Sequence, residues 1–314
     1  MATGGSKKAI VAALLANLGI AVAKFVGFLL TRASSMLAES VHSLADSGNQ
    51  ALLLFGGARA KKPATVAHPF GYGRARYLWS FVVAIVLFAL GSLFSLYEGV
   101  HKLAHPEPLA SVSVAVWILV AAIVLEAFSF RMAVVEANRV RHGQTWWQFI
   151  RHAKAPELPV VLLEDLGAMV GLILALTGVG IAASTQNPDW DAYGTLSIGV
   201  LLGIIAIILA IEMQSLLLGE AASGSDVAAI RRAIEQQPGV RRLIDLKTQH
   251  LGPEELLVAA KVELDDGLAI RGVVAVIDSA EEAVRKAVPE ATAMYIEPDY
   301  PHPGLPGDQV TSEA

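Results

Sequence analysis

A histidine and two carboxylates follow each other at helical spacing between residues 36 and 46. Asp46 comes four residues after His42, so their side chains are neighbours on a helix surface. Glu39 precedes His42 by three residues and lies within about 60° of the same face. Two carboxylates beside an imidazole repel each other unless a cation or a proton lies among them. The stripe therefore predicts a cation site. The alternative is a hydrogen-bonded polar seam that only packs helices.

A second pair of carboxylates, Glu164 and Asp165, interrupts an apolar run later in the chain. Adjacent residues of a helix point about 100° apart, so at most one of the two faces a given site squarely. Glu164 has the alternative of capping a neighbouring backbone or pairing with Lys24. Lys24 itself is either a counter-charge to these carboxylates or a side chain that extends to the membrane interface. We expect the counter-charge.

One site that combines His42, Asp46 and Asp165 suits a divalent first-row metal. Imidazole and carboxylate groups fit Zn²⁺, Mn²⁺, Fe²⁺ or Co²⁺. The fourth position would be filled by Glu164, Glu39 or water. The same groups titrate, so protons and the metal should compete for them.

The composition shows where these charges must lie. Apolar residues make up 54% of the 314 residues and charged residues only 17%, and the mean hydropathy is +0.53. Globular proteins average roughly 45–50% apolar and about 25% charged residues. An excess collected in long runs excludes a cytosolic enzyme, a nucleic-acid-binding protein and a disordered chain. The absence of cysteine excludes disulfides, thiolate metal sites and thiol nucleophiles.

Six stretches are long and apolar enough to cross a bilayer, which takes about 20 residues. Ionisable residues inside such a stretch are costly and are functional candidates by default. Glu126 and Arg131, in the fourth stretch, are interpreted as a structural pair. The first stretch is interpreted as a spanning helix rather than a signal peptide. The six stretches are residues 9–30, 36–58, 78–100, 111–135, 158–183 and 194–218.

Lys and Arg are concentrated in two of the connections, residues 59–77 and 136–157, and the other loops carry almost none. Because cytoplasmic loops carry the excess of positive charge, both termini are predicted in the cytoplasm. The two halves of the chain also differ: residues 1–160 have 15 Lys and Arg against 7 Asp and Glu, and residues 161–314 have 9 against 22. This imbalance predicts two parts with different surroundings.

The acidic part follows a short linker at residues 221–224. Helix-like runs at 225–237 and 273–288 and strand-like runs at 240–251, 256–264 and 293–297 predict the order α-β-β-α-β. We therefore expect a six-helix, all-α membrane domain over residues 1–220 and a small cytoplasmic α+β domain over 225–300. The tail, residues 301–314, is rich in Pro, Gly and polar residues and is predicted to be disordered.

Several motifs in order resemble the cation diffusion facilitator family, the zinc-transporter-like exporters. They are HSLAD at 42–46, preceded by LAE and followed by SGNQ; HPFGYGRARY at 68–77; LLGEAAS at 217–223; and IEP at 296–298. HxxxD alone is weak, but the ordered set on six spans is specific. LLED at 162–165, with the HxxxD motif, resembles a subgroup whose eukaryotic members handle zinc in organelles.

The resemblance implies a homodimer that exchanges a divalent cation for protons by alternating access. The family's intramembrane site takes two ligands from the second span, which match His42 and Asp46, and two from the fifth. Asp165 matches one of the latter. The other falls on Val161, which cannot coordinate a metal, and Glu164 is the nearby substitute. The C-terminal domain would be ferredoxin-like or metallochaperone-like.

The family's other metal sites match less well. In the loop site His68 is present, but Tyr72 holds the second histidine position. The metal-binding positions of the cytoplasmic domain fall on Ile244, Lys261 and Tyr295. We therefore expect that domain to be a dimerisation module held by packing.

The predicted function is a divalent cation/proton antiporter, most simply for Zn²⁺, that exports metal from the cytoplasm. Alternatives are an exporter of Mn²⁺, Fe²⁺ or Co²⁺ that uses the same site, and a non-transporting membrane metal sensor or scaffold. We expect no enzymatic activity, no resident cofactor and no nucleic-acid partner. The expected location is multi-pass in a bilayer, by default the inner (plasma) membrane of a bacterium.

Overall fold

The structure is a computed structural model that describes residues 4–141 and 143–300, with side chains from Leu18 onward. The chain divides into two compact units. The helical unit comprises Met1–Ala58 and Arg76–Gln214, and the sheet unit comprises Arg59–Ala75 and Ser215–Ala314. The tail at 301–314, predicted to be disordered, lies outside the described residues.

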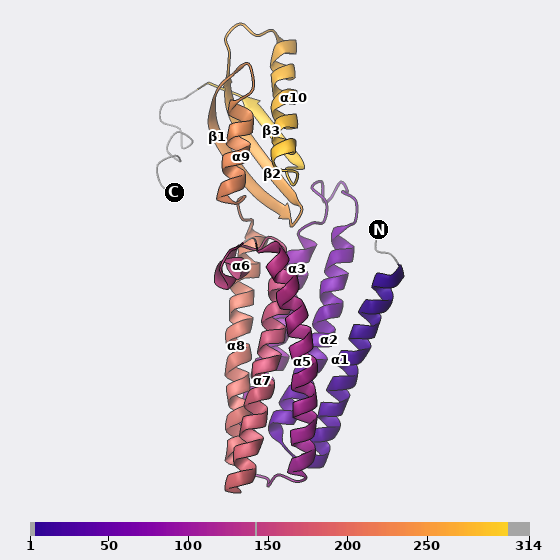
Figure 1. Cartoon of the computed structure of the whole chain (residues 1–314). Coiled ribbons are helices and arrows are strands. Elements are labelled where there is room, and N and C mark those ends of the chain that lie inside the picture. The colour runs from indigo at the N-terminus through magenta and orange to yellow at the C-terminus, as the bar shows by residue number, and fades with distance from the viewer. Residues whose placement is uncertain (1–3, 142, 301–314) are drawn as a thin grey trace. The chain divides into compact units, whose positions relative to one another are not determined.

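Long antiparallel helices build the helical unit (Figure 1). The third of the long segments changes from α to π geometry and back, so it carries three labels although its chain is continuous. The helices are α1 (Gly4–Thr31), α2 (Ser34–Ala60), α3 (Ala75–Val86), η1 (Leu87–Leu93), α4 (Phe94–Ala104), α5 (Val112–Val140), the short α6 (Trp146–His152), α7 (Glu157–Thr185) and α8 (Asp189–Leu218).

Four of these segments are long and apolar enough to cross a membrane: Ala75–Ala104, α5, α7 and α8. The prediction of six spans is thus confirmed for four. Helix α2 is comparably long, with 27 residues. Its buried face is mostly polar, and Ser34, Ser35, Glu39, His42 and Asn49 are all buried there, so its hydropathy is low. Of α1, the described apolar portion runs over Leu18–Thr31.

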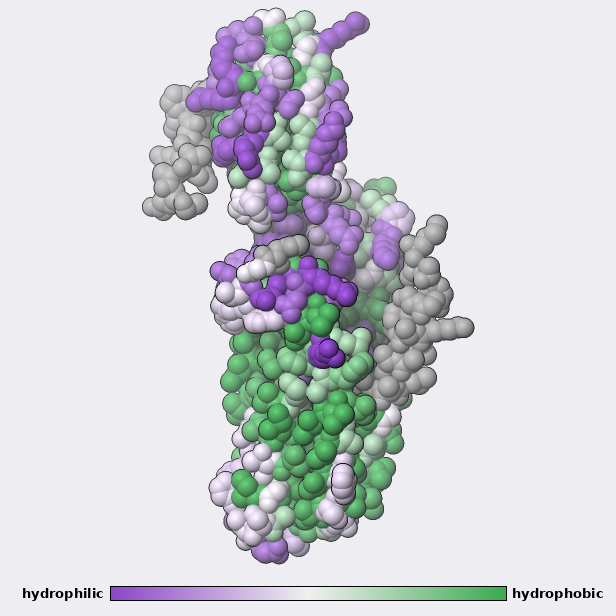
Figure 2. Space-filling model, viewed as in Figure 1, coloured by the Kyte–Doolittle hydropathy of each residue, from purple (hydrophilic) through white to green (hydrophobic). Residues whose placement is uncertain are grey.

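The outside of the helical unit is apolar. Leu29, Val124 and Ile204 each expose about half or more of their side chains. Figure 2 shows hydrophobic residues over most of the visible length of the bundle, with hydrophilic residues gathered where α6 lies. An apolar exterior, with the few ionisable residues buried inside, is the arrangement that a lipid solvent favours.

Glycines let α8 approach its neighbours closely. A Cβ atom on Gly178 of α7 would lie 2.9 Å from the carbonyl oxygen of Trp190, and one on Gly199 would lie 2.9 Å from the backbone nitrogen of Leu96 in α4. Ser92, within the π segment, donates a hydrogen bond to the Gly199 carbonyl at 2.8 Å. Small residues at helix contacts are the usual means of packing in membranes.

At the end of the bundle where α1 ends and α2 begins, which we call the α1–α2 end, a carboxylate caps α2 from another helix. Asp191, in the first turn of α8, is fully buried and accepts hydrogen bonds from the backbone and hydroxyl groups of both Ser34 and Ser35. Lys102 of α4 donates to the Arg32 carbonyl at 2.9 Å in the same region. These contacts satisfy groups that helix termini otherwise leave unpaired.

The sheet unit has the predicted order helix, strand, strand, helix, strand. Strand β1 (Val240–Gly252) pairs antiparallel with β2 (Glu255–Leu264), and β2 pairs parallel with β3 (Ala293–Pro298). Helices α9 (Gly224–Glu235) and α10 (Ile270–Ala287) cover one face of the sheet (Figure 1). Alternate residues of β2 pack against them in the core, with Ile230, Ile234 and Val284 fully buried.

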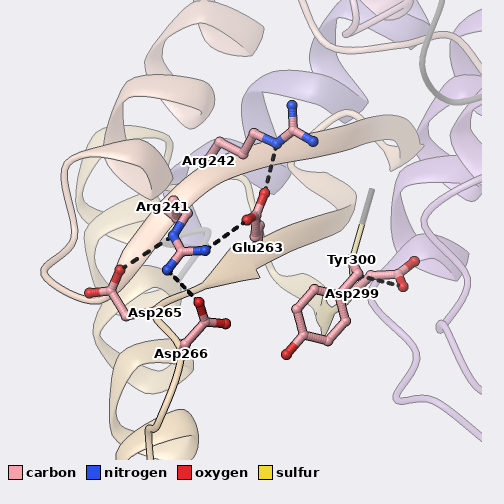
Figure 3. Close-up of polar contacts among 7 residues, drawn as sticks. All are labelled: Arg241, Arg242, Glu263, Asp265, Asp266, Asp299 and Tyr300. Carbon is pink, nitrogen blue, oxygen red and sulfur yellow. Dashed lines mark hydrogen bonds and ion pairs between the residues drawn. The ribbon is translucent and has the colours of Figure 1, made fainter. Parts of the chain in front are cut away.

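Ion pairs fasten the end of the sheet where β1 starts (Figure 3). The Arg241 guanidinium contacts Glu263 at 3.1 Å and Asp266 at 2.9 Å, and Arg242 contacts Glu263 at 2.8 Å. At the opposite end, the loop at 59–75 packs on the β1–β2 hairpin: a Cβ on Gly73 would lie 2.8 Å from the Leu251 carbonyl oxygen. That loop therefore belongs to the sheet unit rather than to the helices that it connects.

Candidate functional site

The polar stripe predicted on the second span lies on α2 and points into the bundle. The side chains of Glu39 and His42 are fully buried, and that of Asp46 is 19% exposed. His42 Nδ1 lies 3.5 Å from Asp46 Oδ1, which is too long for a hydrogen bond. Among the described residues, neither ring nitrogen of His42 has a hydrogen-bond partner. Helical spacing places these three groups on one face, and the His42 ring nitrogens are available to a ligand.

Lys24 of α1 reaches this stripe. Its ammonium group, which is buried, donates to Glu39 Oε2 at 2.9 Å and to the Ser43 hydroxyl at 2.8 Å. The other oxygen, Glu39 Oε1, points at Gly171 of α7, where an added Cβ would approach it to 2.6 Å. The glycine provides the space in which the carboxylate lies.

Both carboxylates of the fifth predicted span are held by amide or hydroxyl donors from other helices. Asn49 of α2 donates to Glu164 Oε1 at 2.7 Å, and Ser129 of α5 donates to Asp165 Oδ2 at 3.0 Å. Glu164 is buried, and Lys24 binds Glu39 instead of it. The pairing of Glu164 with Lys24 that we considered from the sequence is therefore wrong.

The acidic groups of α2, α5 and α7 converge. Asp46 is subject to repulsion from Glu164, Glu126 and Asp165. Glu126 in turn interacts with Asp165, and also with Lys24 and Glu39. We expected Glu126 to pair with Arg131, and the structure instead directs its electrostatic interactions into this cluster.

Sequence reasoning missed three contributors to the cluster: Glu126, Asn49 and Ser129. Only Glu126 left a signal, as an ionisable residue inside an apolar run. Polar uncharged residues such as Asn49 and Ser129 are too common in helices to stand out.

The cluster is open rather than closed around a point. Among the described residues, no three His, Asp or Glu side chains converge closely enough to hold a metal ion in the conformation seen here. His42 with Asp46, Glu164 with Asn49 and Asp165 with Ser129 form three adjacent polar groups. A cation placed among them would relieve both the carboxylate repulsion and the unmet hydrogen-bonding capacity of the imidazole.

The other predicted metal positions lie in the sheet unit and provide weaker donor sets. His68 is exposed and its ring packs on that of Tyr72 at 4.5 Å. Lys261 forms ion pairs with Asp299 at 2.7 Å and Glu297 at 3.6 Å, and these carboxylates raise the pKa of its ammonium group. A lysine already paired in this way offers no metal ligand.

Two family domains match this chain. The cation efflux transmembrane domain matches residues 10–218, and the cytoplasmic domain of cation efflux proteins matches residues 222–299. Together the two matches cover the acidic residues Glu39, Asp46, Glu164 and Asp165 and the whole α-β-β-α-β order.

Individual relatives include "Proton-coupled zinc antiporter SLC30A9, mitochondrial" of Mus musculus, which is 32% identical over 250 residues and 79% of this chain. The chain spans only 44% of the length of that relative. "Metal tolerance protein C4" of Arabidopsis thaliana is 28% identical over 85% of this chain and 59% of its own length. "Cation-efflux pump FieF" of Pectobacterium atrosepticum is 28% identical over 90% of this chain and 89% of its own length.

The cluster of buried carboxylates beside an unpartnered imidazole thus lies within a domain pair characteristic of one group of proteins. The transmembrane domain alone accounts for more than half of the residues. This chain belongs to the cation efflux family and is a multi-pass membrane protein.

Proposed function

We propose that this protein exports a divalent metal cation, most simply Zn²⁺, in exchange for protons. The observation that carries the proposal is the buried His42 imidazole beside the convergent carboxylates of Asp46, Glu164 and Asp165. Both of its nitrogens lack a partner within the part of the chain that the structure describes. Relatives named as a zinc antiporter and a cation-efflux pump support it.

The donor set favours zinc or a similar ion as the cargo. One imidazole and two or three carboxylates match the ligands of tetrahedral Zn²⁺ and also accept Mn²⁺, Fe²⁺ or Co²⁺. Val161 offers no ligand, so Glu164 would complete the set by leaving its hydrogen bond with Asn49. With no cysteine in the chain, softer thiolate coordination is excluded.

Protons would compete with the metal because they bind the same atoms. The metal-free cluster relieves its carboxylate repulsion by protonation, and an entering cation displaces those protons. Lys24 would hold Glu39 through their ion pair and so keep it out of the coordination set. Glu39 would then be the acid that shapes the field at the site without binding the metal.

Alternating access would come from movement between α2 and α7. The hydrogen bond from Asn49 to Glu164 joins these two helices. Gly171 of α7 has no side chain to obstruct α2 beside Glu39. Metal binding draws His42 and Asp46 toward Asp165. Protonation removes that attraction, so the two loaded states favour different arrangements of the helices.

In this proposal α1 and α2 complete a set of six spans, with both termini in the cytoplasm and residues 1–220 as the transport domain. The cytoplasmic α+β domain, residues 225–300, would join two copies of the chain. The family domain that matches residues 222–299 is named for dimerisation (ZT_dimer), which supports a dimer. Ile244, Lys261 and Tyr295 are poor metal ligands, so we propose that packing holds it. A bacterial inner membrane is the proposed location.

The test is zinc flux into proteoliposomes that contain a metal-sensitive dye, with and without an imposed pH gradient. Wild-type protein should move zinc, faster when protons flow the other way. Asp46→Asn and Asp165→Asn should each abolish flux, whereas the matched control Asp278→Asn, an exposed carboxylate of α10, should not. Unchanged flux in both variants would show that this cluster is not the transport site. Metal binding without flux in the wild type would instead favour the sensor or scaffold.

A further inference from the structure

Two histidines follow each other by one helical turn at the end of α4. The rings of His101 and His105 stack with their centroids 4.9 Å apart, and both side chains are exposed. Tyr97, a further turn back, stacks on His101 at 6.0 Å. Nothing in the transport cluster involves these residues.

The surroundings of the pair favour a cation. His101, His105 and Glu98 lie on one stripe of the helix, since they are spaced three and four residues apart. The Glu98 carboxylate interacts electrostatically with His101 and also with Glu107 and Asp191. The pair also lies at a helix C-terminus, where the backbone dipole attracts positive charge.

The nearest competing cation is held elsewhere. Lys102 also interacts with Glu98, but its ammonium group is buried and donates to the Arg32 carbonyl at 2.9 Å. The ammonium group of Lys102 is therefore bound to the end of α1, whereas both imidazoles are exposed. His105 caps the C-terminus of the helix: its backbone N–H donates to the His101 carbonyl at 2.9 Å. The His105 ring takes no part in this cap and is available.

We propose that His101 and His105 form a second metal site, a two-imidazole clip for a divalent transition metal such as Zn²⁺ or Cu²⁺, with water in the remaining positions. Two histidines four residues apart on one helix face can bind a single ion, because a turn of helix brings their ring nitrogens within its span. Imidazole suits zinc, copper and nickel, whereas calcium and magnesium prefer oxygen ligands.

The site lies at the α1–α2 end of the helical unit, opposite the two basic connections. His42 is eight residues into α2, so the transport cluster starts about 12 Å of helix inward from this end. This end is non-cytoplasmic if, as proposed above, the basic connections are cytoplasmic. The clip would then meet ions that have crossed, a point that rests on the proposed function. A bound ion would stabilise the last turn of α4. It would thereby also stabilise the contact of Lys102 with the end of α1.

The test is electron paramagnetic resonance of the full-length protein in lipid nanodiscs with Cu²⁺ as the probe. The wild type should bind an ion whose spectrum shows two coupled imidazole nitrogens. His101→Ala and His105→Ala should each remove that signal and weaken binding at least about tenfold, the loss expected even for an outer partner of a metal ligand. His152→Ala, which removes an exposed histidine of α6, should leave the signal intact.

A rescue variant separates coordination from misfolding. Tyr97→His in the His105→Ala chain again places two imidazoles one turn apart and should restore the two-nitrogen spectrum. Asp46→Asn should keep the signal, so failure of the transport proposal would not affect this result. If His101→Ala and His105→Ala together leave the spectrum and the number of bound ions unchanged, the site does not exist.

Discussion

The ion pair between Lys24 and Glu39 gives the most quantitative prediction. Both side chains are almost completely buried, at 1% and 0% exposure, with 2.9 Å between the charged atoms. Removal of one partner from a buried pair leaves an uncompensated charge, which costs roughly 3–5 kcal/mol. We therefore expect Lys24→Met and Glu39→Gln each to lower the free energy of unfolding by about that amount.

The double variant distinguishes charge pairing from simple loss of packing. With both charges gone no buried ion is left, so Lys24→Met/Glu39→Gln should lie within about 1–2 kcal/mol of the wild type. The coupling energy should then reach about 4 kcal/mol or more. The assay is unfolding in mixed micelles with increasing detergent denaturant. The exposed pair Arg139 and Glu136, at a similar distance of 2.8 Å, is the control and should couple by less than about 1 kcal/mol. Additive single effects at Lys24 and Glu39 would refute the reasoning.

Three further substitutions test separate contacts. Gly171→Ala should destabilise the protein by about 1–3 kcal/mol because its Cβ would press on Glu39, while Gly180→Ala on the same helix meets no atom within 4 Å and should not; thermal melting compares them. Asp191→Asn should lower the melting temperature, since one carbonyl oxygen replaces a carboxylate that accepts from four donors; an unchanged value would show that the cap is dispensable. Burial and Glu254 raise the pKa of Glu255, so folding favours its protonated form and the sheet unit loses stability as pH rises above the ordinary value of 4.5. Glu255→Gln should therefore slow amide exchange in β2 at about pH 7 and not at about pH 4. Equal effects at the two pH values would contradict this.

Local patterns in the sequence were sufficient to predict most of the helices and strands. Long apolar runs predicted the helices of the third to sixth spans to within a few residues at most boundaries, because length and hydropathy are properties of the segment itself. Strand alternation and turn residues did the same for the sheet unit. Neither pattern could predict that the loop at 59–75 packs on the β1–β2 hairpin, since that contact joins distant segments.

The candidate site divides in the same way. Helical spacing placed His42, Asp46 and Glu39 on one face of α2, because all three belong to one helix. Which acid Lys24 binds depends on how α1 packs against α2, and the sequence left that open. In the structure Lys24 binds Glu39, and Glu164 accepts a hydrogen bond from Asn49 instead.

Glu126 shows the limit of local reasoning. Arg131 lies only five residues away and looked like a suitable partner. The packing of α5 against α7 instead brings Glu126 near Asp165, a residue from a different helix. The composition of the cluster is thus a tertiary property, whereas its starting stripe is a local one.

The measurement that tests the central claim most directly is anomalous diffraction at the zinc edge from zinc-soaked crystals. We expect a peak within bonding distance, about 2.0–2.2 Å, of His42 and Asp46, with Asp165 and Glu164 or a water completing the coordination. Occupied zinc elsewhere in the crystal with no peak beside His42 and Asp46 would contradict the assignment of this cluster as the transport site.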